Sequence, residues 1–329
     1  MTTVVVTSAA GGVGRPLVRN LSSSGATVRA LVKNTAQADI ARQDGATEFC
    51  VGDLRDRATL ADGLRGADAI YHAAPTQIID EYPIAEELVE IGHDVSLKHV
   101  VFHSVIHPDI AELPHHQQKE RVEKLLRDSG LAVTVLRPSH YMQNYLELWE
   151  FIQGGLMPYP VSPTSVMGVV DVEDVAAAAA AVLTRPDDHV GKTYDLSTEE
   201  LDRNAMARAF TGALGHPVTA IRLPPDTLAN PLSAAASLTK GLIGALPTTS
   251  PPRALHLLRG IAQSWNARGI RSWPREAQQN YVQMMTYYDQ HGLPAGDRDH
   301  LPALLGRAPT SYTEFAQHEA SRRLHPFRH

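Results

Sequence analysis

The first 140 residues alternate between short apolar stretches rich in β-branched residues and longer amphipathic stretches that end near glycine. The apolar stretches predict strands, at residues 3–7, 27–32, 47–51, 69–72, 99–102 and 133–136. The intervening stretches predict helices, at residues 15–24, 36–43, 58–64, 84–91 and 115–128. A strand–helix unit repeated every ~20–30 residues predicts a parallel sheet covered by helices on both faces.

Beyond residue 140 the pattern becomes more helical. We expect a helix over 175–183, a strand over 193–196, a helix over 201–214 and a mainly helical region after Pro224. The predicted fold class is therefore α/β, a doubly wound parallel-sheet domain with a smaller, mainly helical C-terminal substrate subdomain. The predicted divisions are a core over 1–155, a crossover with the last core strands over 156–200, and a cap over 201–329. Residues 225–280 are expected to form a lid or a subunit contact. A subunit contact would make the protein a homodimer.

Composition narrows the classes of partner. No apolar run approaches the ~20 residues that a bilayer requires, the N-terminus has no secretory pattern, and Cys50 is the single cysteine. We therefore expect a cytoplasmic protein without a membrane partner. A net charge of −6 disfavours direct nucleic-acid binding. The 16 histidines show no zinc-type spacing, so we expect no metal, and no G-x-S-x-G elbow supports a serine hydrolase.

A glycine-rich turn follows the first predicted strand and precedes the first predicted helix. Parallel sheets bind ligands at the carboxyl ends of their strands, and a helix N-terminus favours an anion. The turn fits G-x-x-G-x-x-G with Ser8 in the first position, and it predicts a dinucleotide site. The alternative is a tight turn that only packs helix on strand. The expected cofactor contacts here are Thr7, Ser8, Gly11, Gly12, Val13 and Gly14.

The end of the second predicted strand indicates which cofactor is preferred. An acidic residue there binds the ribose 2′-hydroxyl of NAD, whereas a basic one accommodates the 2′-phosphate of NADP. This strand carries Arg29 and ends at Lys33 without an acid, which favours NADP(H) over NAD(H). The alternative is that both are solvated surface charges. Asp53 and Leu54, after the third strand, are expected to flank the adenine; alternatively, Asp53 caps the next helix.

Several motifs in a consistent order resemble the NmrA-like branch of the atypical short-chain dehydrogenases/reductases. They are Val6 to Gly14 (VTSAAGGVG), Val28 to Lys33 (VRALVK), Gly52-Asp53-Leu54, Ser129 to Pro138, Asp171 to Ala176 and Leu305 to Phe315. The resemblance implies a Rossmann fold that binds NAD(P). It also implies a choice of function, since the family contains NADPH-dependent quinone and dye reductases as well as NADP-sensing regulators that catalyse nothing.

Short-chain dehydrogenases carry Tyr-x-x-x-Lys at the start of a central helix, and the matching positions here are His115 and Lys119. The resemblance implies that Lys119 holds the nicotinamide ribose. Helical spacing places Lys119 and Val122 on the inward face and Glu123 on the solvated face. The alternative is that Lys119 extends its ammonium into solvent. His115 either replaces the tyrosine as a general acid or marks a loss of catalysis.

Loops after other strands supply further candidates. Ser104 follows the fifth strand and is expected to hydrogen-bond the substrate oxygen, or else merely to end the strand. The family resemblance implies that Pro138 borders the carboxamide and that His140, Tyr141 and Asn144 contact substrate. Ordinary loop packing is the alternative. Small residues after the fourth strand would allow a close ribose approach, namely Ala73, Ala74 and Pro75.

Three functional hypotheses remain open from the sequence. The preferred one is an NADPH-dependent oxidoreductase, similar to the quinone reductases, that reduces a small-molecule carbonyl, quinone or imine by hydride transfer. The retained Lys119 favours it. The second is a catalytically silent, NADP-sensing regulator that acts through a protein partner, which the missing tyrosine favours. The third is a non-redox biosynthetic enzyme on the same fold.

Overall fold

The computed structural model describes residues 2–227, 250–266 and 269–324. The chain divides into two compact units. Unit 1 comprises Met1–Ser139, Val172–Ser197 and Gly296–Pro309, and unit 2 comprises His140–Asp171, Thr198–Ala295 and Thr310–His329. The sequence predicts consecutive blocks, whereas these units interleave along the chain. The difference arises because the chain leaves unit 1 after its sixth sheet strand and returns to supply the seventh.

Unit 1 is built on a seven-stranded sheet whose order is β10-β6-β5-β4-β1-β2-β3, with every neighbouring pair parallel. The strands are β1 (Thr3–Thr7), β2 (Thr27–Val32), β3 (Glu48–Val51), β4 (Ala69–His72), β5 (His99–His103), β6 (Val133–Pro138) and β10 (Thr193–Leu196). This order reverses between β1 and β4, which creates the switch point where doubly wound sheets bind ligands. The predicted doubly wound α/β class is confirmed.

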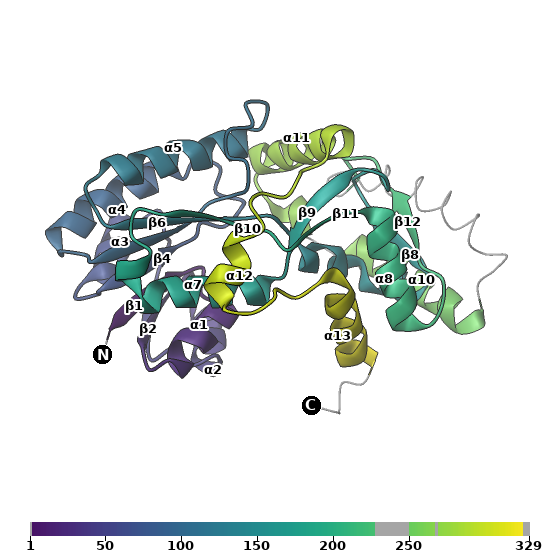
Figure 1. The fold of residues 1–329 in the computed structure, drawn as a ribbon, viewed down its shortest axis with the longest axis horizontal. Coiled ribbons are helices and arrows are strands. Elements are labelled where there is room, and N and C mark those ends of the chain that lie inside the picture. The colour runs from purple at the N-terminus through teal and green to yellow at the C-terminus, as the bar shows by residue number, and fades with distance from the viewer. Residues whose placement is uncertain (1, 228–249, 267–268, 325–329) are drawn as a thin grey trace. The chain divides into compact units, whose positions relative to one another are not determined.

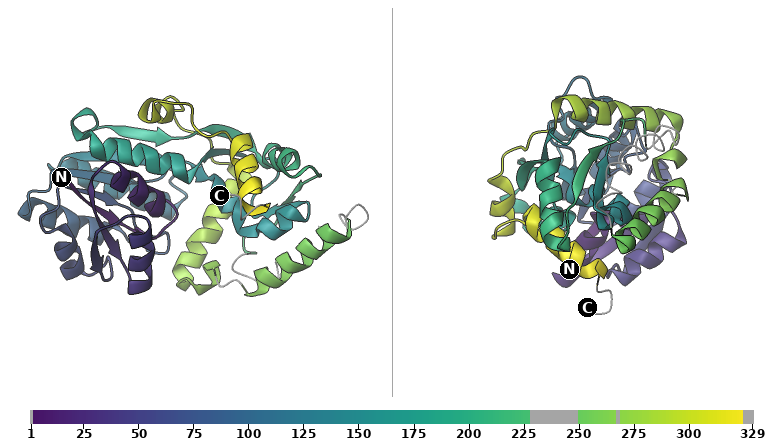
Figure 2. Two further views of the ribbon diagram at one scale, coloured as in Figure 1. Left: turned by 90° about the horizontal axis from the view of Figure 1, so that it is seen from below. Right: turned by 90° about the vertical axis from the view of Figure 1, so that its right-hand side faces the viewer.

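Helices cover both faces of this sheet (Figure 1). On one face lie α3 (Arg57–Leu64), α4 (Tyr82–Asp94) and α5 (Pro114–Asp128), whose apolar side chains join those of the strands in one buried cluster. On the other face, α1 (Gly14–Ser23) packs against α7 (Val172–Thr184), which also contacts α12 (His300–Leu305). The helix α2 (Thr35–Gln43) packs against β2 and β3. The layers can be followed from two further directions in Figure 2.

Local chemistry explains where the early helices begin. The Asn34 side chain accepts a hydrogen bond from the Gln37 amide at the start of α2, and Asp56 accepts one from the Ala58 amide at the start of α3. The cap of α3 is therefore Asp56, so the alternative that Asp53 caps this helix is wrong. The apolar periodicity locates these two helices to within one residue, and the caps fix where they begin. The helix predicted over 201–214 begins later, at Arg203, because residues 201–202 belong to a strand, Glu199–Asp202.

Unit 2 contains more helix than strand, but two small sheets organise it. One has the order β11-β9-β7 and the other pairs β12 with β8. The strands are β7 (His140–Tyr141), β8 (Leu156–Tyr159), β9 (Val166–Val170), β11 (Glu199–Asp202) and β12 (Thr219–Arg222). The helices are η1 (Met142–Leu148), α6 (Trp149–Gln153), α8 (Arg203–Leu214), α10 (Pro251–Asn266), η4 (Gly269–Ser272), α11 (Arg275–His291) and α13 (Tyr312–Leu324). A further short helix, η2 (Pro186–Asp188), belongs to unit 1.

Arg203 holds the strands of unit 2 together from the first turn of α8. Its side chain is fully buried, and its guanidinium donates to the carbonyl oxygens of Val161 at 2.6 Å and Ile221 at 3.1 Å, and also to that of Met157. A buried charge costs less when its donors are hydrogen-bonded. Here backbone carbonyls accept from Nη1 and Nη2, while the buried Nε finds no acceptor among the described residues.

Two expectations, a lid or subunit contact and the absence of a membrane span, can be compared only with the described residues. The lid or subunit contact expected over 225–280 falls partly on residues 228–249 and 267–268, which lie outside the described residues. Within the described ranges, none of the helices combines the length and apolar character that a membrane crossing needs.

Candidate functional site

The turn after β1 is fixed by hydrogen bonds to the end of β4. The Ala73 amide donates to Thr7 Oγ1 at 2.7 Å, and Ser8 Oγ donates to the Ala73 carbonyl at 2.8 Å. Ser8 adopts a left-handed conformation with φ of 52°, and the Gly11 amide donates to its carbonyl at 2.8 Å. Two strand ends on either side of the switch point are thereby joined at the sheet's carboxyl edge.

Gly14 is required by this turn, whereas Gly12 is not. A Cβ on Gly14 would lie 2.2 Å from the Ser8 carbonyl oxygen, while a Cβ on Gly12 would meet nothing within 4 Å. The N-cap of α1, Val13, makes no side-chain cap hydrogen bond, and the first turn holds no acid. The positive end of α1 therefore stands uncompensated beside an open glycine, which is the arrangement that binds phosphate oxygens.

At the end of β2, Lys33 and Arg29 are placed differently. Lys33 is exposed. Arg29 pairs with Glu48 at 2.5 Å, and its guanidinium also donates to the carbonyls of Gly63 at 2.8 Å and Arg65 at 2.7 Å. Since Arg29 ties β2 to β3 and α3, its arrangement favours a structural role, and Lys33 is the cation available at this strand end.

Asp53 and Leu54 follow β3. Two hydrogen bonds from the Arg55 guanidinium, at 2.7 and 3.0 Å, lower the pKa of the Asp53 carboxyl well below its usual range, and Lys33 adds to this effect. Asp53 is thus an ionised group already paired with Arg55. Leu54 is buried in the cluster beneath α3 and α4, so its side chain packs in the core.

Lys119 lies inside unit 1, as its helical position predicts. Its side chain is 6% exposed, and the ammonium lies 2.6 Å from Glu81 Oε2. It also donates to the His103 carbonyl at 3.0 Å and sits 5.0 Å above the centre of the Phe102 ring. The alternative of an ammonium extended into solvent is wrong.

Glu81 is the counter-charge of this lysine, and sequence reasoning missed it. It is 3% exposed, and its second oxygen lies 3.2 Å from Nε2 of the fully buried His72. Burial alone would raise the pKa of Glu81, but the Lys119 ammonium and His72 outweigh it and lower the pKa to about 2. A cluster of Lys119, Glu81 and His72 therefore forms below the carboxyl edge.

Two further residues of this edge were also missed. The Tyr71 hydroxyl and Nδ1 of His103 share a hydrogen bond between β4 and β5. Burial and the nearby Lys119 lower the pKa of His103 to about 3. The sequence does contain a signal for His72 and His103, because each is the last residue of a strand and the two strands are parallel neighbours. No comparable signal marked Glu81.

The two histidines that open α5 differ in their surroundings. His116 is fully buried, and its Nδ1 donates to the His107 carbonyl at 2.8 Å. His115 is half-buried, and burial together with the positive Lys119 lowers its pKa to about 3. At neutral pH the His115 imidazole is uncharged, so it suits hydrogen-bond donation better than proton release from an imidazolium.

Ser104 has a protein partner in this structure. Its hydroxyl donates to Oε1 of Glu123 at 2.5 Å, and Arg137 binds the same carboxylate through two hydrogen bonds of 2.6 and 2.9 Å. Arg127 adds a contact of 2.7 Å. Glu123 is fully buried, so the prediction that it lies on the solvated face of α5 is wrong. Helical spacing alone could not reveal that two arginines and a serine converge there.

The remaining unit 1 candidates also lie at the carboxyl edge. Ala73 and Ala74 are half-buried and Pro75 is exposed just after β4. Pro138 is buried at the end of β6, and its carbonyl accepts from the Ile106 amide at 3.0 Å. These positions follow strands on either side of β5, which carries His103.

His140, Tyr141 and Asn144 belong to unit 2. His140 Nε2 lies 3.0 Å from the Tyr159 hydroxyl and 3.4 Å from Asn144 Nδ2. Burial lowers the pKa of His140 to about 4. Its ring makes edge contacts with Tyr145 and Tyr288, and Tyr141 is half-buried. The predicted substrate residues thus adjoin a cluster of tyrosines.

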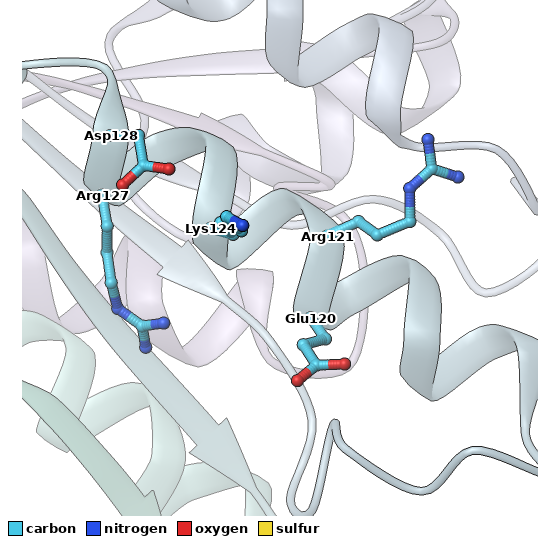
Figure 3. A pocket seen from close by; sticks show the side chains of 5 residues that line it. All are labelled: Glu120, Arg121, Lys124, Arg127 and Asp128. Atoms are coloured by element: carbon cyan, nitrogen blue, oxygen red, sulfur yellow. The ribbon is translucent and has the colours of Figure 1, made fainter.

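The outer face of α5 carries a separate hollow of about 460 Å³ (Figure 3). It is lined by Glu120, Arg121, Lys124, Arg127 and Asp128. These residues are exposed, on the opposite side of α5 from Lys119, and their mixed charge defines no ligand. Within the described parts of the chain, no three His, Cys, Asp or Glu side chains converge as a metal site would require.

Comparison with known sequences gives a consistent set of relatives. The model of the NmrA-like family matches residues 1–243. The chain is 31% identical over 235 residues to the (4-alkanoyl-5-oxo-2,5-dihydrofuran-3-yl)methyl phosphate reductase of Streptomyces griseus, covering 70% of this chain and 80% of that one. It is 28% identical over 219 residues to the NAD(P)H azoreductase of Xenophilus azovorans, covering 65% and 75%.

Solved structures share the fold. The NADPH complex of the quinone oxidoreductase QOR2 from Escherichia coli matches with a TM-score of 0.71 and 21% identity, covering 96% of this chain and 99% of that one. The NADP complex of NmrA, a negative transcriptional regulator, matches with a TM-score of 0.65 and 19% identity, covering 96% and 94%. The same architecture therefore occurs in a reductase and in a regulator.

Proposed function

Because the chain belongs to the NmrA-like family, we propose that it is an NADPH-dependent reductase that transfers hydride to a small conjugated carbonyl, quinone or imine. The observation that carries the proposal is the pairing of an open phosphate-binding turn at Gly12 with a buried, charged Lys119 at the same sheet edge. The named reductases among its relatives give further support. Bound NADPH would supply the hydride.

In this proposal the chain's own residues bind and orient. The turn from Ser8 to Gly14 and the amino end of α1 hold the pyrophosphate, with Ala73 to Pro75 beside the ribose. Lys33 accepts the 2′-phosphate, which is the basis for a preference for NADP(H) over NAD(H). Lys119 places a fixed positive charge near the nicotinamide ribose, and Pro138 borders the carboxamide.

The proposed role of His115 is to donate a neutral imidazole hydrogen bond to the substrate oxygen. That bond stabilises the negative charge that develops when hydride arrives. Ser104 contributes to the same oxygen only if it exchanges its bond to Glu123. Within unit 2, His140, Tyr141 and Asn144 are proposed to bind substrate, and the tyrosines around His140 suit a planar aromatic molecule.

The decisive experiment measures NADPH oxidation against a panel of quinones, enones, imines and azo dyes, with NADPH binding followed by fluorescence. Turnover on at least one class is expected, and His115→Ala should lower kcat more than it changes the affinity for NADPH. Unchanged turnover in that variant would remove the role of His115.

A second function has a specific observation in its favour. The short-chain dehydrogenase tyrosine position holds His115, whose lowered pKa leaves almost no imidazolium to donate a proton at neutral pH. This supports an NADP-sensing regulator that acts through a protein partner. Tight NADPH binding without turnover on any substrate of the panel would favour that function over the reductase.

A further inference from the structure

The N-cap position of α4 carries a carboxylate, Glu81, whose side chain makes no cap hydrogen bond. Instead it turns inward, where it is 3% exposed, and meets the Lys119 ammonium at 2.6 Å and His72 at 3.2 Å. Glu81 therefore forms a buried ion pair in place of a helix cap, so its side chain serves a role other than stabilising α4.

We propose that Glu81 is the positioning residue of Lys119, and that it holds the lysine charged and in place for the cofactor. The proposal rests on the proposed cofactor site. Glu81 acts through Lys119 and does not itself touch the substrate or the cofactor. His72, stacked on Phe102 at 5.9 Å between ring centres, lies 3.2 Å from the other carboxylate oxygen.

The surroundings of the ammonium explain why a counter-charge is needed. Besides Glu81, the titratable groups facing it are His103 from β5, His115 from α5 and, behind Glu81, His72 from β4. None of these supplies a negative charge, and the Phe102 ring lies below. A buried lysine without a counter-ion loses its proton readily, since burial disfavours the charged form.

The test is the pH dependence of NADPH binding in Glu81→Gln. Glutamine preserves the shape but removes the charge, so the Lys119 pKa should fall into the accessible range. The NADPH Kd of the variant, divided by that of the wild type at each pH between 7 and 9, should then rise about tenfold per pH unit above the new pKa. A merely structural loss would shift this ratio by the same factor at every pH.

Three variants control the measurement. Glu90→Gln removes an exposed carboxylate of the same helix, which pairs with Arg57 at 2.7 Å, and should keep the wild-type profile. Lys119→Met and the double variant Glu81→Gln/Lys119→Met should both bind weakly and without a pH slope. A slope that persists in the double variant would overturn the inference, because it could not come from Lys119.

The outcomes separate the inference from the function on which it rests. If wild-type protein does not bind NADPH, the proposed function fails. If wild type binds and Glu81→Gln keeps a flat ratio, the inference fails and the function stands. If Glu81→Gln does not fold, Glu81→Asp carries the test. Its shorter carboxylate should displace the ammonium and raise the Kd severalfold without a pH slope, and wild-type affinity in that variant would refute the inference.

Discussion

Replacing Gly14 with alanine separates the packing role of the β1–α1 turn from its binding role. The added Cβ would lie 2.2 Å from the Ser8 carbonyl oxygen and 2.9 Å from both the Cα and the carbonyl carbon of Ala9. All three are backbone atoms that cannot rotate away, so the turn itself must move by roughly 1 Å to restore ordinary contact. Overpacking of this kind costs ~1–3 kcal/mol, and the close approach to three fixed atoms puts Gly14→Ala in the upper half of that range.

A smaller effect acts in the opposite direction. Gly14 begins α1, and exchanging glycine for alanine in a helix gains ~0.5–1 kcal/mol through backbone entropy and helix propensity. The net destabilisation is therefore about 1–2.5 kcal/mol. For a domain of this size class it corresponds to a decrease in Tm of roughly 2–10 °C. Urea denaturation followed by circular dichroism measures the free energy directly.

Gly12→Ala is the matched control, because a Cβ at Gly12 meets nothing within 4 Å. This variant should keep the wild-type free energy of unfolding within ~0.5 kcal/mol. It should nevertheless weaken NADPH binding at least tenfold, since the methyl group occupies the side from which phosphate approaches. The reasoning is refuted if Gly14→Ala is as stable as wild type, or if Gly12→Ala binds NADPH normally.

Three further predictions concern charge. Lys33→Ala should weaken NADPH binding about tenfold, which corresponds to the loss of ~1.4 kcal/mol from an exposed charge-assisted hydrogen bond, and should leave NADH binding unchanged. Equal effects on the two cofactors would contradict the assignment of Lys33 to the 2′-phosphate. The free energy of unfolding should fall as the pH drops from about 6.5 towards 4. The reason is that burial lowers the pKa values of His99 and His116 to about 4, so these histidines are protonated in the unfolded chain at a higher pH than in the folded one. Each contributes up to ~1.4 kcal/mol per pH unit, and a urea midpoint that stays constant over this range would be inconsistent with neutral buried histidines. Glu123→Ala should lower the free energy of unfolding by about 3 kcal/mol, because Arg137 and Ser104 lose their shared acceptor. Glu120→Ala, on the exposed side of α5, should lower it by less than ~0.5 kcal/mol, and the urea midpoints of the two variants measure the difference.

The sheet and its helices were predictable because they depend on local periodicity. The strand at Ala69–His72 was predicted with its observed ends, and α5 differs from its prediction by one residue. The capping box at Ser311 and Glu314 is a signal of the same local kind, with the Ser311 amide donating to Glu314 at 2.9 Å. Each of these signals lies within a few consecutive residues.

The buried polar groups were not predictable in the same way. The burial of Glu123 depends on Arg137 from β6, and that of Lys119 depends on Glu81 from another helix. Helical spacing correctly placed Lys119 inward through its apolar neighbours, but it placed Glu123 outward through its charge. Partners separated by tens of residues leave no trace in the local pattern. The roles assigned to the candidate site residues therefore stay predictions.

The interleaved order of the units has a consequence for synthesis of the chain. β6 ends at Pro138, but its outer neighbour β10 begins at Thr193, about 55 residues later. At a translation rate of ~5–20 residues per second, the edge of β6 waits for several seconds with its backbone groups unpaired. An unpaired strand edge is a template for pairing with other chains. The nascent protein is therefore most exposed to aggregation before β10 is made, and slower translation of residues 139–192 should reduce the yield of folded protein.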